Sequence, residues 1–278
     1  MVWTSGDHLS KSRILTLQNT FLSLYFSWNL SLPFKKETTM NKILIFALLS
    51  FSIFAQDQNK KMTVFFHGLN NKPTVFHDLI KEINNPSTVF NHTLPANPHL
   101  WLSHVKKEIL QISSLAKKNN QAWQIIAFSL GGLLTLRALN EMHLPKPPVK
   151  VVLFAPALTP RHLEFLHYTS SLLSEEIIIP SFAPSDIRAK NGVSVGEYTM
   201  LFSLAEKIQS SSQTVFNFPI KIFYSSQDEL VDPIKLMEFC HQRGWATQDI
   251  KTLQAPHHLL VQKGRVSQDS WLKIKNSF

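Results

Sequence analysis

The chain contains little cysteine, little glycine and few charged residues for its length. Cys240 is the single cysteine among 278 residues, so no disulfide can form within the chain and no site can gather several thiolates around a metal. A lone cysteine in a helical segment is typically a small buried apolar side chain, and we expect no chemical role for it. Apolar residues make up 44% of the chain and charged residues 17%, which is typical of a folded domain with a sizeable core.

The chain also lacks a continuous basic stripe. Its formal net charge is +9 at pH 7, but the basic residues occur as separate pairs such as 60–61, 106–107 and 117–118, without interleaved aromatic residues. Nucleic-acid-binding domains concentrate lysine and arginine on one face. We therefore expect no nucleic-acid partner, and nothing in the sequence indicates a stable protein partner.

The apolar run near the start is too short to cross a bilayer comfortably. It covers 43–55, follows Met40 and Lys42, and gives way abruptly to polar residues. A spanning helix needs about 20 apolar residues. A short basic segment, an apolar run and a small residue such as Ala55 are instead the layout of a secretory signal peptide. We predict a signal peptide over 40–55 and an exported product, periplasmic or secreted, if translation starts at Met40.

The remaining sequence divides at this segment. Residues 1–39 have a mixed composition with no clean period, and we expect a non-native or disordered N-terminal extension there. The alternative is a true N-terminal extension with an uncleaved or cytoplasmic product. Residues 56–278 are long enough for one full domain.

Strand-like and helix-like segments alternate along this domain. The predicted strands lie in 61–71, 87–97, 121–128, 151–158, 220–226 and 250–256. The predicted helices are 101–118, 130–142, 233–243 and 266–276. Several of the strands are apolar on both faces. The pattern therefore predicts an α/β fold with a mostly parallel sheet covered by helices on both faces. The aromatic-rich stretch 159–215 interrupts the alternation, and we expect it to form a small cap over the carboxyl edge of the sheet, where ligands bind in such folds.

A serine lies at one strand-to-helix junction, in "AFSLGG" (127–132). A hydroxyl is a poor nucleophile unless a base takes its proton and fixed donors stabilise the oxyanion. A tight turn of this kind lifts the serine out of the sheet and places the next N–H at a helix N-terminus. The turn crowds its neighbours, and Ala127 and Gly131 are small. The pattern favours Ser129 as a nucleophile over a simple turn residue.

Four segments in order resemble one family. With "FFHGLN" (65–70), "AFSLGG", "FYSSQDELVDP" (223–233) and "LQAPHHLLVQKG" (253–264), the chain resembles the α/β-hydrolase superfamily, in its esterase, monoacylglycerol lipase and carboxylesterase branch, over about 62–278. Ala127 replaces the first glycine of the usual G-x-S-x-G, adding one methyl group. The resemblance implies an α/β-hydrolase fold and hydrolysis of a small or lipid-like ester through an acyl-enzyme, with no cofactor and no metal.

The resemblance also implies a role for each matching residue. Ser129 is the nucleophile, Asp228 the acid and His257 the base, in the chain order of this superfamily. The backbone N–H groups of Leu69 and Leu130 form the oxyanion hole.

Neighbouring residues compete for two of these roles. Asp232 is the alternative acid, although it is also expected to cap the following helix. His258 is the alternative base; His257 matches better because the family follows its histidine with a helix-starting residue and then an apolar pair. A zinc site at the two histidines is disfavoured, because adjacent side chains diverge and no carboxylate cluster accompanies them.

The apolar content of 159–215 favours an ester with an apolar acyl group. Two alternatives stay open, because a fold does not by itself fix a function. One is a peptidase, thioesterase or carbon–carbon bond hydrolase on the same fold. The other is a non-catalytic binding protein that keeps the fold.

Overall fold

The computed structural model describes residues 61–83, 88–92, 94–161, 168, 172–181, 183–211, 216–245 and 249–278. The extension predicted over 1–39 and the signal peptide predicted over 40–55 lie outside the described residues. All that follows concerns one compact unit, 58–278.

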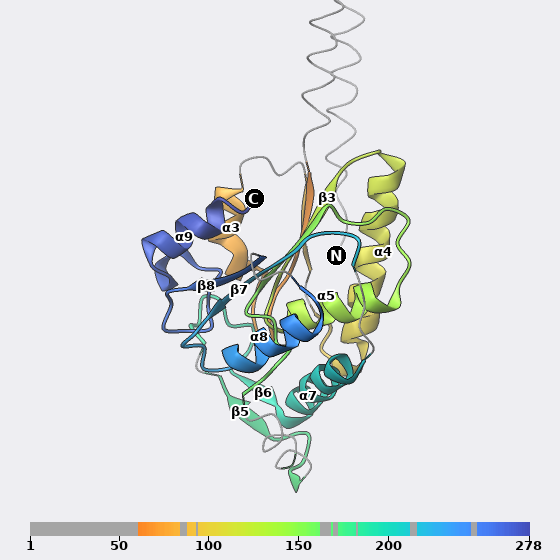
Figure 1. The fold of residues 1–278 in the computed structure, drawn as a ribbon. Helices are drawn as coiled ribbons and strands as arrows, with labels where there is room; N and C mark the ends of the chain where they lie inside the picture. The colour runs from red at the N-terminus through yellow and green to blue at the C-terminus, as the bar shows by residue number, and fades with distance from the viewer. Residues whose placement is uncertain are drawn as a thin grey trace, which may run out of the picture. The chain divides into compact units, whose positions relative to one another are not determined.

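A six-stranded sheet forms the centre of this unit, with the strand order β2-β1-β3-β4-β7-β8 (Figure 1). Its strands are β1 (Met62–Phe66), β2 (Thr88–His92), β3 (Trp123–Phe128), β4 (Lys150–Phe154), β7 (Ile220–Ser225) and β8 (Ile250–Leu253). Every pairing in this sheet is parallel. The prediction of a mostly parallel sheet is confirmed.

Helices cover both faces of the sheet. One face carries α4 (Trp101–Lys118), α5 (Leu130–Glu141) and α8 (Pro233–Gln242), and the other carries α3 (His77–Glu82) and α9 (Gln268–Lys275). Successive strand residues point to opposite faces, so Ile125 packs in the α4 side of the core and Ile126 in the α3 side. Both side chains are fully buried. The apolar character of both strand faces follows from this double covering.

Short 3₁₀ helices complete the connections: η1 (Pro73–Phe76), η2 (Pro98–Leu100) and η4 (Lys263–Arg265). Helix α3 and the preceding η1 were not among the predicted elements. They bury Val75, Phe76 and Leu79 against the sheet. Within the described residues, no helix combines the length and apolar character needed to span a membrane.

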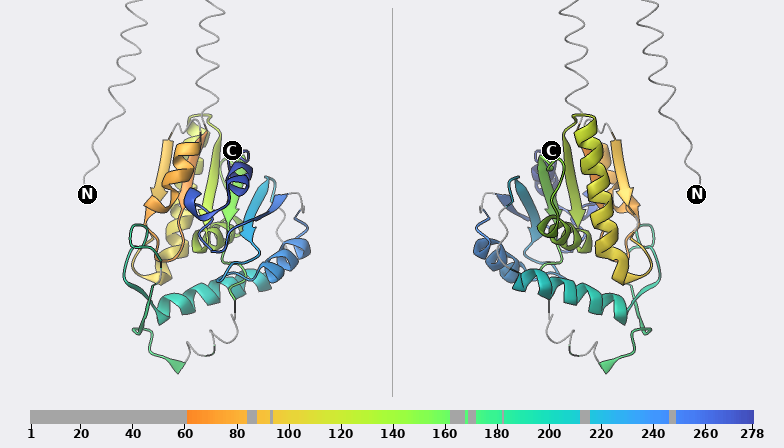
Figure 2. Two further views of the ribbon diagram at one scale, coloured as in Figure 1. Left: turned by 90° about the vertical axis from the view of Figure 1, so that its left-hand side faces the viewer. Right: turned by 90° about the vertical axis from the view of Figure 1, so that its right-hand side faces the viewer.

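The described residues of the inserted segment, 159–215, include a two-stranded antiparallel sheet and a long helix. These elements are β5 (Ile178–Pro180), β6 (Gly192–Ser194) and α7 (Val195–Ser210). Ser194 caps α7: its hydroxyl accepts from the Glu197 N–H, and the Glu197 carboxylate accepts from the Ser194 N–H. Figure 2 shows α7 crossing the unit at the end toward which the strand arrows point. The segment therefore lies at the carboxyl edge of the main sheet.

Candidate active site

Ser129 lies in the turn that joins β3 to α5. Its backbone has φ 53° and ψ −119°, in the left-handed half of conformational space that residues with a Cβ rarely occupy. The Ser129 N–H donates to the Phe154 carbonyl at 2.9 Å, which ties the turn to the end of β4. Such strain persists only where the surroundings enforce it, and it is concentrated at functional sites.

Two glycines allow other backbone segments to approach this turn. A Cβ placed on Gly131 would lie 2.1 Å from the Phe66 carbonyl oxygen, so no larger residue fits between α5 and the end of β1. A Cβ on Gly68 would lie 3.0 Å from the Cβ of Ser129. The loop that follows β1 therefore packs directly against the serine turn.

The two backbone groups predicted for an oxyanion hole come from these segments. Leu130 is the first residue of α5, so its N–H precedes the hydrogen bonds of the helix and lies at the positive end of the helix dipole. Leu69 follows Gly68, the residue packed against Ser129. His67 Nδ1 donates to the Gly68 carbonyl at 2.9 Å, which fixes the start of this loop. The structure thus brings both predicted segments to the serine.

Asp228 is buried in the loop after β7, with 1% of its surface exposed. Its Oδ1 accepts from the N–H groups of Leu230 and Val231 at 2.9 and 2.8 Å, and its Oδ2 lies 2.8 Å from His258 Nδ1. Burial alone would raise the pKa of this carboxyl, but the charge and hydrogen bond of His258 and the two N–H donors outweigh it and hold the pKa below its usual range. Asp228 is therefore an ionised acceptor.

The histidine that meets Asp228 is His258, which corrects the preference for His257. His258 is buried, with 5% of its surface exposed, whereas the His257 side chain is exposed. The backbone N–H of His258 donates to the Glu229 carboxylate at 2.8 Å. This bond fixes the loop so that His258, and not His257, faces Asp228. Family spacing could not separate two adjacent histidines whose side chains leave the turn in different directions.

The pairing also determines which nitrogen of His258 can accept a proton. Because an ionised carboxylate can only accept, Nδ1 must donate to Asp228, and the lone pair of the neutral ring lies on Nε2. Nε2 is buried and has no hydrogen-bond partner among the described residues. The His258 ring lies against the ring of Phe128, with centroids 5.0 Å apart, so it sits beside the residue that precedes Ser129. The structure therefore places a proton acceptor against the side chain of the residue before the strained serine.

Arg161 binds the loop after β7 that carries Asp228, here called the acid loop, and the sequence did not predict this contact. Arg161 Nε donates to the Asp228 carbonyl at 2.6 Å, and the Arg161 N–H donates to the Leu230 carbonyl at 2.8 Å. No motif surrounds Arg161, so the sequence offers no signal for this contact. Asp232, the alternative acid, accepts from the Ile234 and Lys235 N–H groups as the cap of α8 and forms no hydrogen bond or ion pair with either histidine.

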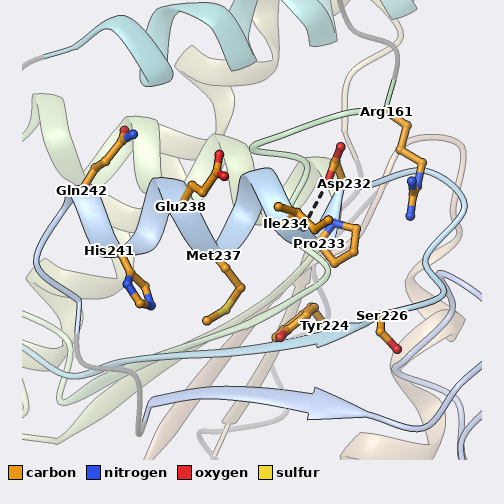
Figure 3. Close-up of a pocket in the computed structure, with 10 residues that line it drawn as sticks. All are labelled: Arg161, Tyr224, Ser226, Asp232, Pro233, Ile234, Met237, Glu238, His241 and Gln242. Atoms are coloured by element: carbon orange, nitrogen blue, oxygen red, sulfur yellow. Dashed lines mark hydrogen bonds between the residues drawn. The ribbon is translucent and has the colours of Figure 1, made fainter.

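A groove of about 800 Å³ lies beside the acid loop, between α8 and β7 (Figure 3). Its lining residues are Arg161, Tyr224, Ser226, Asp232, Pro233, Ile234, Met237, Glu238, His241 and Gln242. Neither Ser129 nor His258 is among these residues. In the part of the chain that the structure describes, no three histidine, cysteine or acidic side chains are grouped so that they could hold a metal ion.

Comparisons with known proteins give structural likeness only. No family model and no curated protein sequence matches the chain. It is similar in structure to the monoacylglycerol lipase of Paleococcus ferrophilus, with TM-score 0.60, 15% identity and coverage of 78% of this chain and 93% of that one. A soluble variant of monoglyceride lipase from Saccharomyces cerevisiae gives TM-score 0.63, 13% identity, and coverage of 78% and 84%. An alpha/beta hydrolase fold protein from Burkholderia ambifaria gives TM-score 0.50, 10% identity, and coverage of 79% and 90%. At these identities the likeness shows a shared fold and nothing finer.

Proposed function

We propose that this chain, which has the α/β-hydrolase fold, is a serine hydrolase that cleaves carboxylic esters through Ser129, His258 and Asp228. One observation supports the proposal: the buried Asp228–His258 pair, joined at 2.8 Å, packs against Phe128, the residue before a serine held at a strained strand-to-helix turn. An acid, a base and a nucleophile in this relation are the parts that acyl transfer requires.

In the proposed reaction, Ser129 Oγ attacks the ester carbonyl carbon while His258 Nε2 takes the hydroxyl proton. The carbonyl electron pair moves onto oxygen, and the N–H groups of Leu69 and Leu130 stabilise that negative charge. The intermediate collapses, the C–O bond to the alcohol breaks, and the alcohol leaves with the proton from His258. Water then attacks the acyl-enzyme by the same steps and releases the acid. Asp228 stabilises the imidazolium formed in each half-reaction.

The substrate we propose is an ester with an apolar acyl group. Large apolar side chains are exposed on the inserted segment, at Leu172, Leu173 and 177–179, close in sequence to the part that contacts the loop after β1. Two of the similar structures are named as monoacylglycerol and monoglyceride lipases, which is consistent with such a substrate.

The test treats the full chain and its Ser129→Ala variant with a fluorophosphonate, followed by intact mass and peptide mapping. We expect one adduct, on Ser129, and a fall in ester turnover of about 10³-fold or more in the variant. Ser226→Ala is the matched control, because Ser226 is exposed on the acid loop and lies outside the proposed triad; it should keep full labelling and turnover.

The same proteins are then assayed with esters from acetyl to palmitoyl and with matched amides and thioesters. Absence of an adduct on the folded protein would favour a non-catalytic binding protein. Faster turnover of the amide or the thioester than of any ester would favour a peptidase or a thioesterase.

A further inference from the structure

The residue that follows the proposed Leu69 donor is bound to the inserted segment. Asn70 Nδ2 donates to the Lys190 carbonyl at 2.9 Å, and Asn70 Oδ1 accepts from the Lys190 N–H at 2.8 Å. The Asn70 carbonyl accepts from the Ala189 N–H, also at 2.9 Å. The Asn70 side chain is buried, with both of its polar groups satisfied by backbone groups of one distant segment.

This contact is part of a longer pairing. The Lys72 N–H donates to the Ile187 carbonyl at 2.6 Å, and Asn71 forms an antiparallel bridge with Arg188. Residues 70–72 and 187–190 therefore run past each other as two short strands do. The loop after β1 is a joint product of the main sheet and the inserted segment.

The backbone conformation explains why asparagine stands at this position. Asn70 has φ 55°, in the left-handed region that asparagine tolerates better than most residues with a Cβ. The Asn71 N–H donates to the Gly68 carbonyl at 3.2 Å and closes a tight turn around Leu69. Leu69 thus lies between Gly68, which is packed against Ser129, and Asn70, which is tied to the inserted segment.

The inserted segment is itself anchored beyond this contact. The Lys190 side chain pairs with the carboxylate of Glu197, which also accepts from the Ser194 N–H in the cap of α7. A continuous set of bonds therefore links α7, through Lys190 and Asn70, to the turn that carries the Leu69 N–H.

We propose that Asn70 is a positioning residue that holds the Leu69 N–H in the oxyanion hole by locking the loop after β1 to residues 187–190. The proposal rests on the serine hydrolase function above. It gives the inserted segment a part in the chemistry at Ser129 as well as in substrate binding.

The test compares Asn70→Gly with Asn120→Gly in the full chain. Glycine allows the positive φ at both positions, so Asn70→Gly removes the side-chain bonds to Lys190 without forcing a change of φ, and Asn120→Gly matches its backbone effect. Asn120 is the matched control because it also has a positive φ, 48°, but lies in an exposed turn after α4. We expect kcat of Asn70→Gly to fall roughly 10- to 100-fold with KM within about twofold, because misplaced catalytic groups cost about this much. Asn120→Gly should retain both constants.

A second readout isolates the oxyanion hole. Each enzyme is assayed with an ester and with its thionoester, whose sulfur accepts hydrogen bonds weakly. The kcat ratio of ester to thionoester should fall in Asn70→Gly and stay unchanged in Asn120→Gly. Because kcat is expressed per active site titrated with fluorophosphonate, partial unfolding of a variant does not imitate the effect.

An unchanged kcat in Asn70→Gly would overturn the inference, and so would a fall in kcat that leaves the ester to thionoester ratio unchanged. Both results leave the proposed function intact as long as Ser129→Ala is inactive. Retained turnover in Ser129→Ala would instead overturn the proposed function.

Discussion

Two apolar runs of this chain have opposite surroundings. In β3, "WQIIAF", every side chain is buried, and Ile126 has 0% of its surface exposed. In the inserted segment, β5 and the residue before it read "IIIP", and Ile178 is 57% exposed. The apolar character of β3 is accounted for by packing between two layers of helices. That of β5 is not, and clustered exposed apolar side chains are typical of a surface that binds something.

The inserted segment is itself divided in this respect. Phe202 and Ala205 of α7 are buried with the helices on the main sheet, whereas residues 172–180 are exposed throughout. The segment therefore has an anchored half that belongs to the core and an exposed half that does not. We expect changes in the sheet and its edge loops to affect chemistry or folding, and changes in the exposed half to leave folding unaffected.

The largest effect on kcat is expected from a substitution in the loop after β8. His258→Ala should lower kcat for ester hydrolysis about 10³- to 10⁴-fold, because the proposed base and the partner of Asp228 are both lost. His257→Ala should change kcat by less than about twofold, because His257 is exposed and the hydrogen bond to Asp228 comes from His258. The measurement is steady-state kinetics on both variants after circular dichroism has established folding.

The reverse result would place the chemistry on His257 and show that the turn takes another arrangement during catalysis. A loss in both variants would show that the turn as a whole, and not one imidazole, is required.

The second effect tests the two apolar runs directly. Ile126→Ala should lower the free energy of unfolding by about 2–5 kcal/mol, because it removes buried methyl groups and leaves a cavity between β3 and the helices on that face. Ile178→Ala should change it by no more than about 0.5 kcal/mol, because that side chain is exposed. Urea unfolding of the two variants, with equal m-values, measures the difference.

A loss above about 2 kcal/mol in Ile178→Ala would mean that β5 stabilises the fold after all. The contrast between the two runs would then disappear.

The sequence predicted the long periodic helices of this fold and missed a short one. Helix α4 was predicted at 101–118 and is found at Trp101–Lys118, because its apolar residues recur over many turns and pack on one face. Helix α3 was missed because six residues are too few to establish a period, although Leu79 is buried. A long helix can be predicted from the period of its apolar residues, whereas a short helix is determined mainly by the surface against which it packs.

Some residues of the candidate site could be predicted from the local sequence, and others could not. Ser129 could be found because a strand-to-helix junction with small neighbours is visible along the chain. The choice between His257 and His258 depends on how the loop after β8 is oriented by the hydrogen bond to Glu229, and no local sequence pattern predicts that orientation. The contacts of Asn70 and Arg161 join segments far apart in the chain and could not be read from either segment alone.

The smallest expected effect contrasts a carboxylate of the packed region with one of the exposed half. Glu82 at the end of α3 lies 3.0 Å from Lys275 Nζ and accepts from the Trp271 indole at 3.3 Å; the hydrogen bonds from Lys275, Trp271 and Lys263 lower its pKa to about 2. A pKa depressed by folding means that the stabilisation is complete above about pH 4.5 and is lost as the pH falls toward 2. Glu82→Gln should therefore lower Tm slightly at neutral pH, and its difference from the wild type should shrink toward zero as the pH falls through about 2. Glu175→Gln, in the exposed half, is the control and should have the Tm of the wild type over the same pH range. If the Tm difference between Glu82→Gln and the wild type did not vary with pH, the Glu82 carboxylate would act through its shape and not through its charge.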